Sequence, residues 1–362
     1  MSAKTYSAVL VGTRKIEIKD FEVPEIGEDD GLLKVEMCGV CGSDPRRYRS
    51  TDPKSFPRIL GHEILGRIAE IGSRAAARWG VQKGDRVVVE HLFGCGHCKM
   101  CLIGEYRFCK EHGGYGGPTS MEVPPHLWGA YGQHMYLAPN SRVHPISEAV
   151  PADAATMTCA NLGNGIRWTR TKGGVTIGDN VVIIGPGGQG LGAIVAAKEA
   201  GATRIIAMGL TQDAGRFELA RLFGATHTVD LEKEDPVEAV KALTDGMGAD
   251  VVVDLTGSVR SAPLSLDLVR PLGTVVIGSN TGETEVAIQT SKIVVKEIRY
   301  QGVNTHDTPA VRQAITIIES GKYPIQKMVT HHFSLDEADK ALRAAAGEVK
   351  LDGFIKGVIV PD

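Results

Sequence analysis

The sequence predicts a protein of two parts, a mainly-β region over residues 1 to about 160 and then an α/β domain with a parallel, doubly wound sheet. Two observations lead to this prediction. Short apolar or alternating runs broken by Gly and Pro fill the first part, which is typical of strands joined by turns. From about residue 173, compact apolar runs alternate with helical patterns, which is typical of βαβ units. A length of 362 residues also suits two domains.

In the first part, strands are expected at residues 9–23 and 32–40, where the residues run apolar or alternate with period two. Gly and Pro interrupt the chain from Pro24 to Gly61, and such residues mark turns. A segment rich in Gly and aromatic residues follows at 113–132. Few helices are therefore expected before residue 160.

In the second part, apolar runs and helical patterns follow each other in strict order. Strands are expected at residues 180–184, 204–208, 227–229, 249–255 and 273–279, and helices at 191–200, 216–223, 237–245 and 261–269. After about residue 300, helices at 309–322 and 335–347 precede a final apolar strand at 353–360. This order predicts a parallel sheet with helices on both faces.

The charge of the chain is nearly balanced, with 40 Lys and Arg against 43 Asp and Glu and a net charge of −3. Nucleic-acid binders need a strongly basic surface, so no nucleic-acid partner is expected. No apolar run approaches the roughly 20 residues of a membrane span, and the N-terminus lacks a secretory apolar region. The sequence thus predicts a cytoplasmic protein without a membrane partner.

The first motif with a chemical meaning is the glycine-rich run after the strand at 180–184. Its residues are Gly185, Pro186, Gly187, Gly188, Gln189 and Gly190, which form the pattern G-x-G-x-x-G between a strand and a helix. Glycines allow a tight turn and a close approach to a pyrophosphate, whose charge the N–H groups of the helix start can bind. The pattern predicts an NAD(P) site, and a glycine-rich turn without a ligand is the alternative.

The end of the next strand bears on the choice between NAD and NADP. NAD sites usually carry an acidic residue there, whereas this chain has Gly209. The missing carboxylate favours NADP, because Thr211 and Arg216 could then bind its 2′-phosphate. Asp213 could take the acidic role if the loop folds back, so NAD stays open. Arg216 could also be an exposed residue at the start of a helix.

The seven cysteines all lie before residue 160. Cys95, Cys98, Cys101 and Cys109 stand within one short segment, and three of them are spaced by three residues. Four thiolates fill the tetrahedral shell of zinc and leave no open position, so this pattern predicts a structural zinc site. Disulfides are the alternative, but nothing in the sequence indicates an oxidising compartment.

A second, dispersed set offers two thiols and an imidazole from Cys41, His62 and Cys159, with Glu63 beside the imidazole. Three protein ligands leave zinc a fourth position for water or a substrate oxygen, as catalysis requires. Each of these residues alone is a weak signal, because a single buried His or Cys is more often part of a core.

Taken together, these motifs resemble those of the zinc-dependent medium-chain dehydrogenases/reductases, which include alcohol and polyol dehydrogenases. The matching segments are CGVCGSD at 38–44, GHE at 61–63, the four-cysteine lobe at 95–109, the Cys159 segment and GPGGQG. The resemblance implies a GroES-like catalytic domain at 1–160, a Rossmann domain at 161–300 and a return to the catalytic domain at 301–362.

The resemblance also implies roles for individual residues. Cys41, His62 and Cys159 match catalytic zinc ligands, and Glu63 matches a carboxylate that can approach the metal during ligand exchange. Asp44 matches the carboxylate that orients the metal-binding imidazole. Ser43 matches the hydroxyl that bonds the substrate oxygen and starts proton transfer. Cys38 matches no ligand.

One departure from the family concerns this proton transfer. Many relatives place a histidine two residues after the motif aspartate, where this chain has Arg46, which is a poor proton carrier. The cofactor ribose and water, or another residue, would carry the proton instead. Arg46 and Arg47 could also receive an anionic substrate, and a solvated basic loop is the alternative.

The implied function is a reversible hydride transfer between a primary or secondary alcohol and NAD(P)⁺, with one catalytic and one structural zinc per chain. A polyol or amino-alcohol dehydrogenase is the alternative, and a non-catalytic member of the fold is a further one. Relatives form homodimers or homotetramers, and the apolar strand at 273–279 would suit pairing at a sheet edge.

Overall fold

The computed structural model describes residues 4–361, which divide into two compact units. The first unit runs to Cys159 and also contains Ile318–Gly321 and the residues from Ile325 onward. The second unit contains Ala160–Ile317 and Lys322–Pro324. It therefore extends beyond the boundary near residue 300 that was expected from the sequence. Two elements beyond that boundary belong to this unit: β16 (Arg299–Gly302) pairs with its sheet, and most of α10 (Thr308–Glu319) lies in it.

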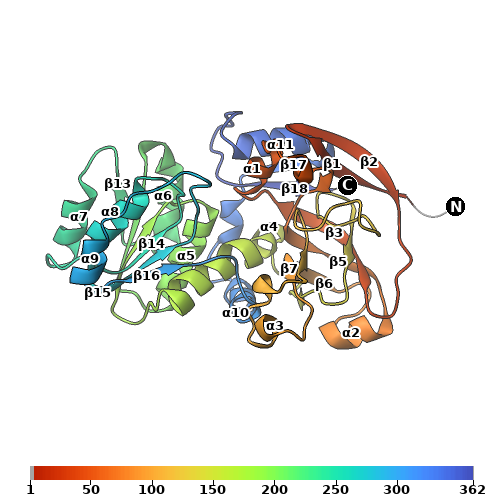
Figure 1. Ribbon diagram of the computed structural model, residues 1–362, viewed down its shortest axis with the longest axis horizontal. Coiled ribbons are helices and arrows are strands. Elements are labelled where there is room, and N and C mark those ends of the chain that lie inside the picture. The colour runs from red at the N-terminus through yellow and green to blue at the C-terminus, as the bar shows by residue number, and fades with distance from the viewer. Residues whose placement is uncertain (1–3, 362) are drawn as a thin grey trace. The chain divides into compact units, whose positions relative to one another are not determined.

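The second unit is built on a six-stranded sheet whose order is β13-β12-β11-β14-β15-β16 (Figure 1). The strands are β11 (Asn180–Ile184), β12 (Arg204–Gly209), β13 (His227–Asp230), β14 (Ala249–Asp254), β15 (Val269–Ile277) and β16. Every neighbouring pair is parallel, which confirms the predicted parallel sheet. The order reverses between β11 and β14, the place where open α/β sheets bind ligands.

The prediction that residues 273–279 form a sheet edge is wrong. Residues 273–277 belong to β15, which pairs with β14 on one side and with β16 on the other. The edge strand is β16, whose sequence RYQG carries little apolar character. A strand at a sheet edge need not be apolar, because its neighbour on one side supplies the hydrogen bonds that fix it.

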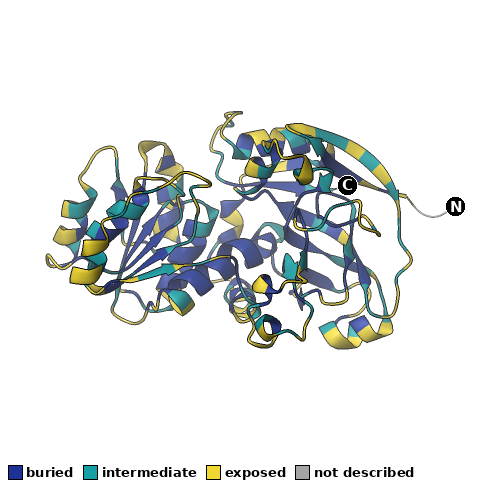
Figure 2. Ribbon diagram, in the orientation of Figure 1, coloured by how far each residue is buried: buried dark blue, intermediate teal, exposed yellow. Residues whose placement is uncertain are grey.

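Four helices of this unit follow the strands as the sequence predicted, namely α5 (Gly188–Glu199), α6 (Ala214–Leu222), α7 (Pro236–Leu243) and α8 (Ser261–Leu268). The sequence did not predict α9 (Thr290–Val295), and it placed α10 (Thr308–Glu319), which ends in the first unit, after the expected domain boundary. Two π-helical stretches, Thr158–Gly163 and Ile166–Lys172, lead into the unit. Figure 2 shows the strands of the sheet largely in the colour of buried residues. Buried Val, Ile and Leu side chains between sheet and helices form the core.

The first unit contains a three-stranded sheet and a larger, mostly antiparallel one. The small sheet has β1 (Lys4–Gly12), β2 (Lys15–Glu22) and β4 (Arg58–Ile59). The large sheet has β3 (Gly31–Gly39), β5 (Glu63–Ile71), β6 (Arg86–Val89), β9 (His134–Leu137), β10 (Val143–Pro145), β17 (His331–Ser334) and β18 (Gly357–Val360). The C-terminal strand β18 pairs with β3, so the two ends of the chain share one sheet.

Short elements complete the first unit. They are the helices α1 (Asp44–Tyr48), α2 (Ser73–Trp79), α3 (Lys99–Leu102), α4 (Ala152–Thr156) and α11 (Ala338–Ala345), and the paired strands β7 (Leu92–Phe93) and β8 (Gly113–Gly114). One hydrophobic cluster joins β1, β3 and β5 to α11 and β18. Over residues 4–361, no helix combines the length and apolar character that a bilayer crossing demands.

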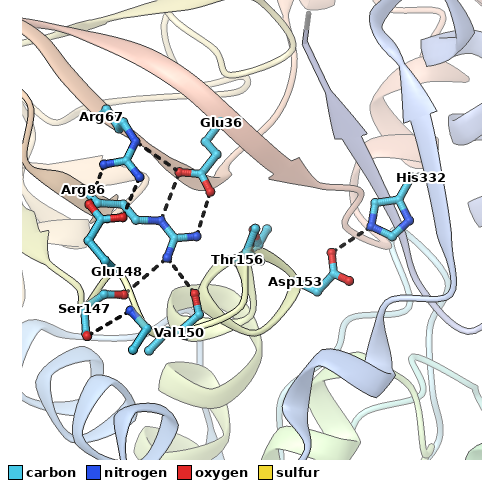
Figure 3. Close-up of polar contacts among 11 residues, drawn as sticks. Glu36, Arg67, Arg86, Ser147, Glu148, Val150, Asp153, Thr156 and His332 are labelled. Carbon is cyan, nitrogen blue, oxygen red and sulfur yellow. Dashed lines mark hydrogen bonds and ion pairs between the residues drawn. The ribbon is translucent and has the colours of Figure 1, made fainter.

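A network of charged residues holds the segment that leads to Cys159 (Figure 3). The Arg86 guanidinium donates to both carboxylate oxygens of Glu36, at 3.0 and 2.7 Å, and to the carbonyl oxygens of Ser147 and Val150, at 3.3 and 2.6 Å. Three strands thereby fix the loop before α4. Arg86 lies on β6 and its partner Glu36 on β3, and Arg67 of β5 binds Glu148 in the loop.

The far end of this segment is fixed as well. Asp153 on α4 lies 2.8 Å from Nε2 of His332 on β17. The strands of the large sheet thus hold both the loop before α4 and α4 itself, and Cys159 follows shortly afterwards.

Replacing Arg86 by Met should lower the free energy of unfolding by about 2–4 kcal/mol, because two carbonyls and a partly buried carboxylate lose their donor. Arg74→Met is the matched control, since the Arg74 side chain is 61% exposed and its ion pairs with Glu28 and Asp29 lie at the surface. That change should cost less than about 1 kcal/mol. Urea unfolding followed by circular dichroism measures both variants, and equal losses would contradict the role given to Arg86.

Candidate functional site

The glycine-rich turn between β11 and α5 has the geometry of a nucleotide-binding loop. Gly185 has φ +95°, a left-handed conformation that favours glycine, and its N–H donates to the carbonyl of Met208 at 2.9 Å. Gly187 caps the N-terminus of α5, and a Cβ atom there would meet nothing within 4 Å. The backbone of Gly187 therefore stays open for a ligand at the positive end of the helix.

Gly190 is required for a different reason. A Cβ atom at this position would lie 2.0 Å from the carbonyl oxygen of Gly185, so a side chain cannot fit between the helix and the turn. The three glycines of the pattern thus have separate roles: Gly185 makes the turn, Gly187 leaves space for a ligand and Gly190 allows close packing.

A cavity of about 710 Å³ opens beside this turn within the second unit. The predicted residues Gly185, Gly187, Gly209 and Arg216 line it, whereas Gly188, Gln189, Gly190 and Thr211 lie outside its lining. Asp213, Glu232, Arg260 and apolar residues such as Leu264 complete its wall. A volume of this size accommodates the adenosine part of a dinucleotide.

The loop after β12 folds back toward the strand end. Oδ2 of Asp213 accepts a hydrogen bond from the Leu210 N–H at 3.0 Å and would lie 2.9 Å from a Cβ atom on Gly209. The Asp213 carboxylate thus occupies the space that an acidic side chain at position 209 would need. Glycine at 209 therefore follows from the position of Asp213.

The two residues that were expected to bind a 2′-phosphate have acidic partners. Nη1 of Arg216 lies 2.6 Å from Oδ1 of Asp213. The Thr211 hydroxyl donates to Asp230 at 2.8 Å, and the Thr211 N–H donates to Glu232 at 2.9 Å. Of these three carboxylates, Asp213 and Glu232 line the cavity, and Asp230 lies outside its lining.

The four cysteines of the lobe lie together, with their sulfur atoms all within 4.8 Å of one another. Cys101 Sγ is 3.9 Å from Cys95 Sγ and 3.6 Å from Cys98 Sγ. Zn–S bonds of about 2.3 Å in a tetrahedron place sulfur atoms about 3.8 Å apart, whereas a disulfide requires about 2.05 Å. The spacing fits one zinc ion, and all four thiols are free.

The thiols of this cluster differ in acidity. Hydrogen bonds from the backbone at His97 and Cys98 lower the pKa of Cys95 to about 6, whereas burial raises the pKa of Cys101 to about 12. A metal ion would have to displace protons from the less acidic thiols, so metal affinity at this lobe should fall with falling pH.

A buried polar cluster that the sequence reasoning missed anchors the lobe. The Tyr106 hydroxyl donates to Oε2 of Glu90, and Oε1 of the same carboxylate lies 2.9 Å from Nε2 of His144. Glu90 is fully buried, and Arg142 lies over the Tyr106 ring at 4.4 Å. The lobe is thus tied to β10 by side chains as well as by its own cysteines.

The second metal-binding candidate joins residues from two strand ends. Cys41 follows β3, His62 precedes β5 and Glu63 begins it, and one ligand atom from each lies within 4.8 Å of the others. Thiolate, imidazole and carboxylate are all ligands that zinc accepts. This donor set fits a metal ion with an open position.

Cys159 is the predicted ligand that does not join this close group. It is 2% exposed, and its sulfur is not among the atoms within 4.8 Å of Cys41, His62 and Glu63. Burial, with the nearby charges of Glu90 and Glu63, raises the pKa of its thiol well above the usual value. Its approach to a metal therefore stays a prediction.

Asp44 holds the imidazole of His62 by an ion-pair contact to Nδ1. Its carboxylate is fully buried, accepts from the Cys41 N–H at 2.9 Å and from the Tyr131 hydroxyl at 3.0 Å, and has Oδ1 3.3 Å from Nδ1 of His62. Burial opposes the charge of Asp44, but His62 and these donors outweigh it and lower its pKa. With Nδ1 of His62 directed at Asp44, Nε2 is left for a metal.

Glu63 has a buried partner that the sequence reasoning missed. Nζ of Lys356 lies 2.6 and 2.8 Å from the two carboxylate oxygens, and the Lys356 side chain is 8% exposed. A Cβ atom on Gly39 would lie 2.1 Å from Oε2 of Glu63, so glycine at 39 gives this carboxylate its space. The available signal was a single lysine inside the apolar run GFIKGVIV, since such a buried charge needs a partner.

The remaining candidates lie in the first unit. Ser43 precedes α1, and its side chain makes no capping bond to that helix. On α1, Arg46 is exposed and Arg47 is half-buried. The His91 ring, which was not singled out in the sequence, lies 5.3 Å from the His62 ring.

Comparisons with known proteins agree with this arrangement. Residues 27–148 match the family described as "Alcohol dehydrogenase GroES-like domain", and residues 188–320 match "Zinc-binding dehydrogenase". The chain is 40% identical to the "Probable alcohol dehydrogenase adh" of Mycobacterium tuberculosis over 98% of its length and 97% of that protein. It is 32% identical to the erythritol/L-threitol dehydrogenase of Mycolicibacterium smegmatis over 95% of its length and 94% of that protein.

Among solved structures, the chain is similar to an alcohol dehydrogenase of Thermotoga maritima. The TM-score is 0.90 at 27% sequence identity, and the match covers 100% of both chains.

Two glycine substitutions should separate the roles of the turn. Gly190→Ala should lower the free energy of unfolding by about 1–3 kcal/mol, because its Cβ would displace the Gly185 carbonyl, and should also weaken nucleotide binding. Gly187→Ala should leave stability unchanged and weaken nucleotide binding about tenfold or more. Thermal unfolding without nucleotide and titration with NAD⁺ measure the two effects. A large stability loss for Gly187→Ala would contradict the open position of that residue.

Proposed function

The chain belongs to the zinc-dependent medium-chain dehydrogenases/reductases, and we propose that it oxidises an alcohol at a zinc site made of Cys41, His62 and Cys159, with Glu63 beside them. Membership makes the chain an oxidoreductase that acts on CH–OH groups of small molecules and takes zinc and NAD or NADP as cofactors. The observation that carries the proposal is the close group of Cys41, His62 and Glu63, oriented by Asp44.

The bound cofactors would supply the Lewis acidity that polarises the alcohol oxygen and the nicotinamide that accepts the hydride. The residues of the chain prepare the site for that chemistry. Asp44 fixes the His62 ring, and Lys356 compensates the charge of Glu63 in a buried environment. Ser43 is proposed to accept a hydrogen bond from the substrate hydroxyl and to take up its proton while it releases its own. Because Arg46 is a poor proton carrier, the ribose of a bound cofactor together with water, or another residue, would take the released proton.

We propose the cysteine group at 95–109 as a structural zinc site. The distances between the sulfur atoms support this role, because four thiolates at this spacing would fill the coordination shell of a zinc ion. A polyol substrate is a second possibility within the same chemistry. The relative named erythritol/L-threitol dehydrogenase supports this possibility, because its name indicates a polyol substrate. A polyol would carry a second hydroxyl next to the reacting one, and this hydroxyl would be available for binding.

Zinc content and activity test these proposals together. The wild-type protein should contain about two zinc ions per chain and should reduce NAD⁺ or NADP⁺ with at least one alcohol or polyol of a panel. Cys41→Ser should lose about one zinc and nearly all activity with a small change in stability. Cys98→Ser should also lose about one zinc, but should lower the unfolding temperature strongly. Elemental analysis, calorimetry and absorbance of the reduced nicotinamide are the measurements.

Loss of activity in Cys41→Ser with two zinc ions retained would contradict the proposed catalytic ligand. A protein with both zinc ions that oxidises no alcohol with either nucleotide would overturn the proposed enzyme function.

We further propose that the chain prefers NAD over NADP. The carboxylate of Asp213 lies at the end of β12, where it could bind the ribose hydroxyls of NAD, and it repels a 2′-phosphate. Asp230 and Glu232 add negative charge near Thr211, and Arg216 is already paired with Asp213. These contacts support the opposite preference from the one that Gly209 alone favours.

In the wild type, kcat/KM with NAD should therefore be higher than kcat/KM with NADP by about tenfold or more. Asp213→Ser should shift this ratio toward NADP by about tenfold or more, because it removes the repulsion and frees Arg216. Glu238→Gln is the control, since the Glu238 side chain on α7 is 72% exposed. A wild type that prefers NADP, or a ratio unchanged in Asp213→Ser, would rule out this role for Asp213.

A homodimer or homotetramer is also proposed. Two features of the second unit support it: the edge strand β16 pairs on one side only within the described sheet, and Val294 and Val295 of α9 are 74% and 83% exposed. The mass from light scattering measures the oligomeric state.

A further inference from the structure

Arg47 on α1 is half-buried in the first unit, and no carboxylate among residues 4–361 forms an ion pair with its guanidinium. Within residues 4–361, its guanidinium has neither a hydrogen bond nor an ion pair. Two other arginines of the same segment differ from it. Arg46 is exposed, and Arg49 has its Nη1 3.6 Å from Glu348.

The guanidinium of Arg47 lies against a loop containing Gly116 and Gly117, and this loop also packs on His62 of the candidate metal site. A Cβ atom on Gly117 would be 2.5 Å from Cζ of Arg47, so the guanidinium lies directly on this residue, whose φ of +150° favours glycine. A Cβ atom on the neighbouring Gly116 would be 2.9 Å from Cβ of His62. Gly116 and Gly117 thus separate Arg47 from the predicted ligand His62 by a single layer of backbone.

The surroundings of Arg47 are short of available negative charge. Asp44 is close enough for its charge to act on Arg47, but its carboxylate is already engaged by Cys41, Tyr131 and His62. Arg58 is close as well, and its guanidinium donates to the carbonyls of Gly117 and Lys54. Burial lowers the pKa of Arg47, and the charge of Arg46 lowers it further, although Asp44 opposes the effect.

Such a half-buried guanidinium is favourable when an anion binds to it, since charges removed from water need a partner. The planar group can donate two parallel hydrogen bonds to a carboxylate or a phosphate. We propose that Arg47 binds an anionic group, carboxylate or phosphate, carried by the alcohol substrate. The inference rests on the proposed function, because it assigns one end of the substrate to Arg47 and the reacting hydroxyl to the candidate metal site.

Matched pairs of alcohols test the inference. The pairs are glycerol with glycerol 3-phosphate and 1,2-propanediol with lactate, and the measured quantity is the ratio of kcat/KM for the anionic to the neutral member. In at least one pair, the wild type should have a higher kcat/KM for the anionic member than for the neutral one. Arg47→Gln should lower that ratio about tenfold or more, and Arg47→Lys should restore part of it, because it keeps the charge but loses the paired donors. Arg49→Gln is the control and should keep the wild-type ratio, since Glu348 already engages Arg49.

A binding measurement makes the test independent of turnover. Inorganic phosphate should raise the unfolding temperature of the wild type and of Arg49→Gln, but not of Arg47→Gln. Without phosphate, Arg47→Gln should be at least as stable as the wild type, because it removes an uncompensated charge. A strong loss of stability would instead identify a structural role and overturn the proposal.

Three kinetic results would also overturn it: a wild type that favours the neutral member of both pairs, a ratio unchanged in Arg47→Gln, or a raised KM for the nucleotide as the main effect. The last result would assign the guanidinium to a phosphate of the cofactor. If no alcohol is oxidised at all, the proposed function fails, while the phosphate shift still decides whether Arg47 is an anion site.

Discussion

The buried ion pair between Lys356 and Glu63 is the interaction on which the close group of Cys41, His62 and Glu63 depends. Glu63 is almost fully buried beside Cys41 and His62, and a carboxylate in that position without a cation would be strongly unfavourable. Lys356 directly precedes β18, so the pair forms only when the last strand of the chain lies beside β3. The cluster therefore requires both ends of the chain, and the return of the C-terminal segment to the first unit is a condition for its geometry.

Much of the second unit could be predicted from the sequence, because its signals are local. The strand predicted at 180–184 is β11, and the glycine-rich run that follows it opens α5. The sequence did not predict the edge strand β16 and placed the sheet edge at β15 instead. The segment RYQG has no apolar pattern of its own, and its pairing with β15 identifies it as a strand. The helix α9 was also missed, and its exposed Val294 and Val295 do not follow the pattern of a helix packed on a core.

The candidate site was predictable wherever spacing carries the signal. The four cysteines of the lobe and the Gly61–Glu63 triplet stand close in sequence, and the structure brings each set together. Lys356, Tyr131 and Glu90 were missed, because each acts through a partner that is distant in sequence. The position of Asp213 depends on how one loop folds, and the difference between Arg46 and Arg47 depends on which neighbour buries each of them. Neither can be read from residue types alone.

Glu90 lies between the cysteine lobe at 95–109 and Cys159 and acts on both. One of its carboxylate oxygens accepts the Tyr106 hydroxyl of the cysteine lobe, while its negative charge acts on the Cys159 thiol. If the lobe lost its metal and unfolded, Tyr106 would leave, and water would reach a carboxylate that is now fully buried. The electrostatic environment of Cys159 would change without any movement of that residue. Damage to the cysteine lobe at 95–109, by chelation or oxidation of its thiols, would thus change the surroundings of the Cys159 thiol through a single side chain.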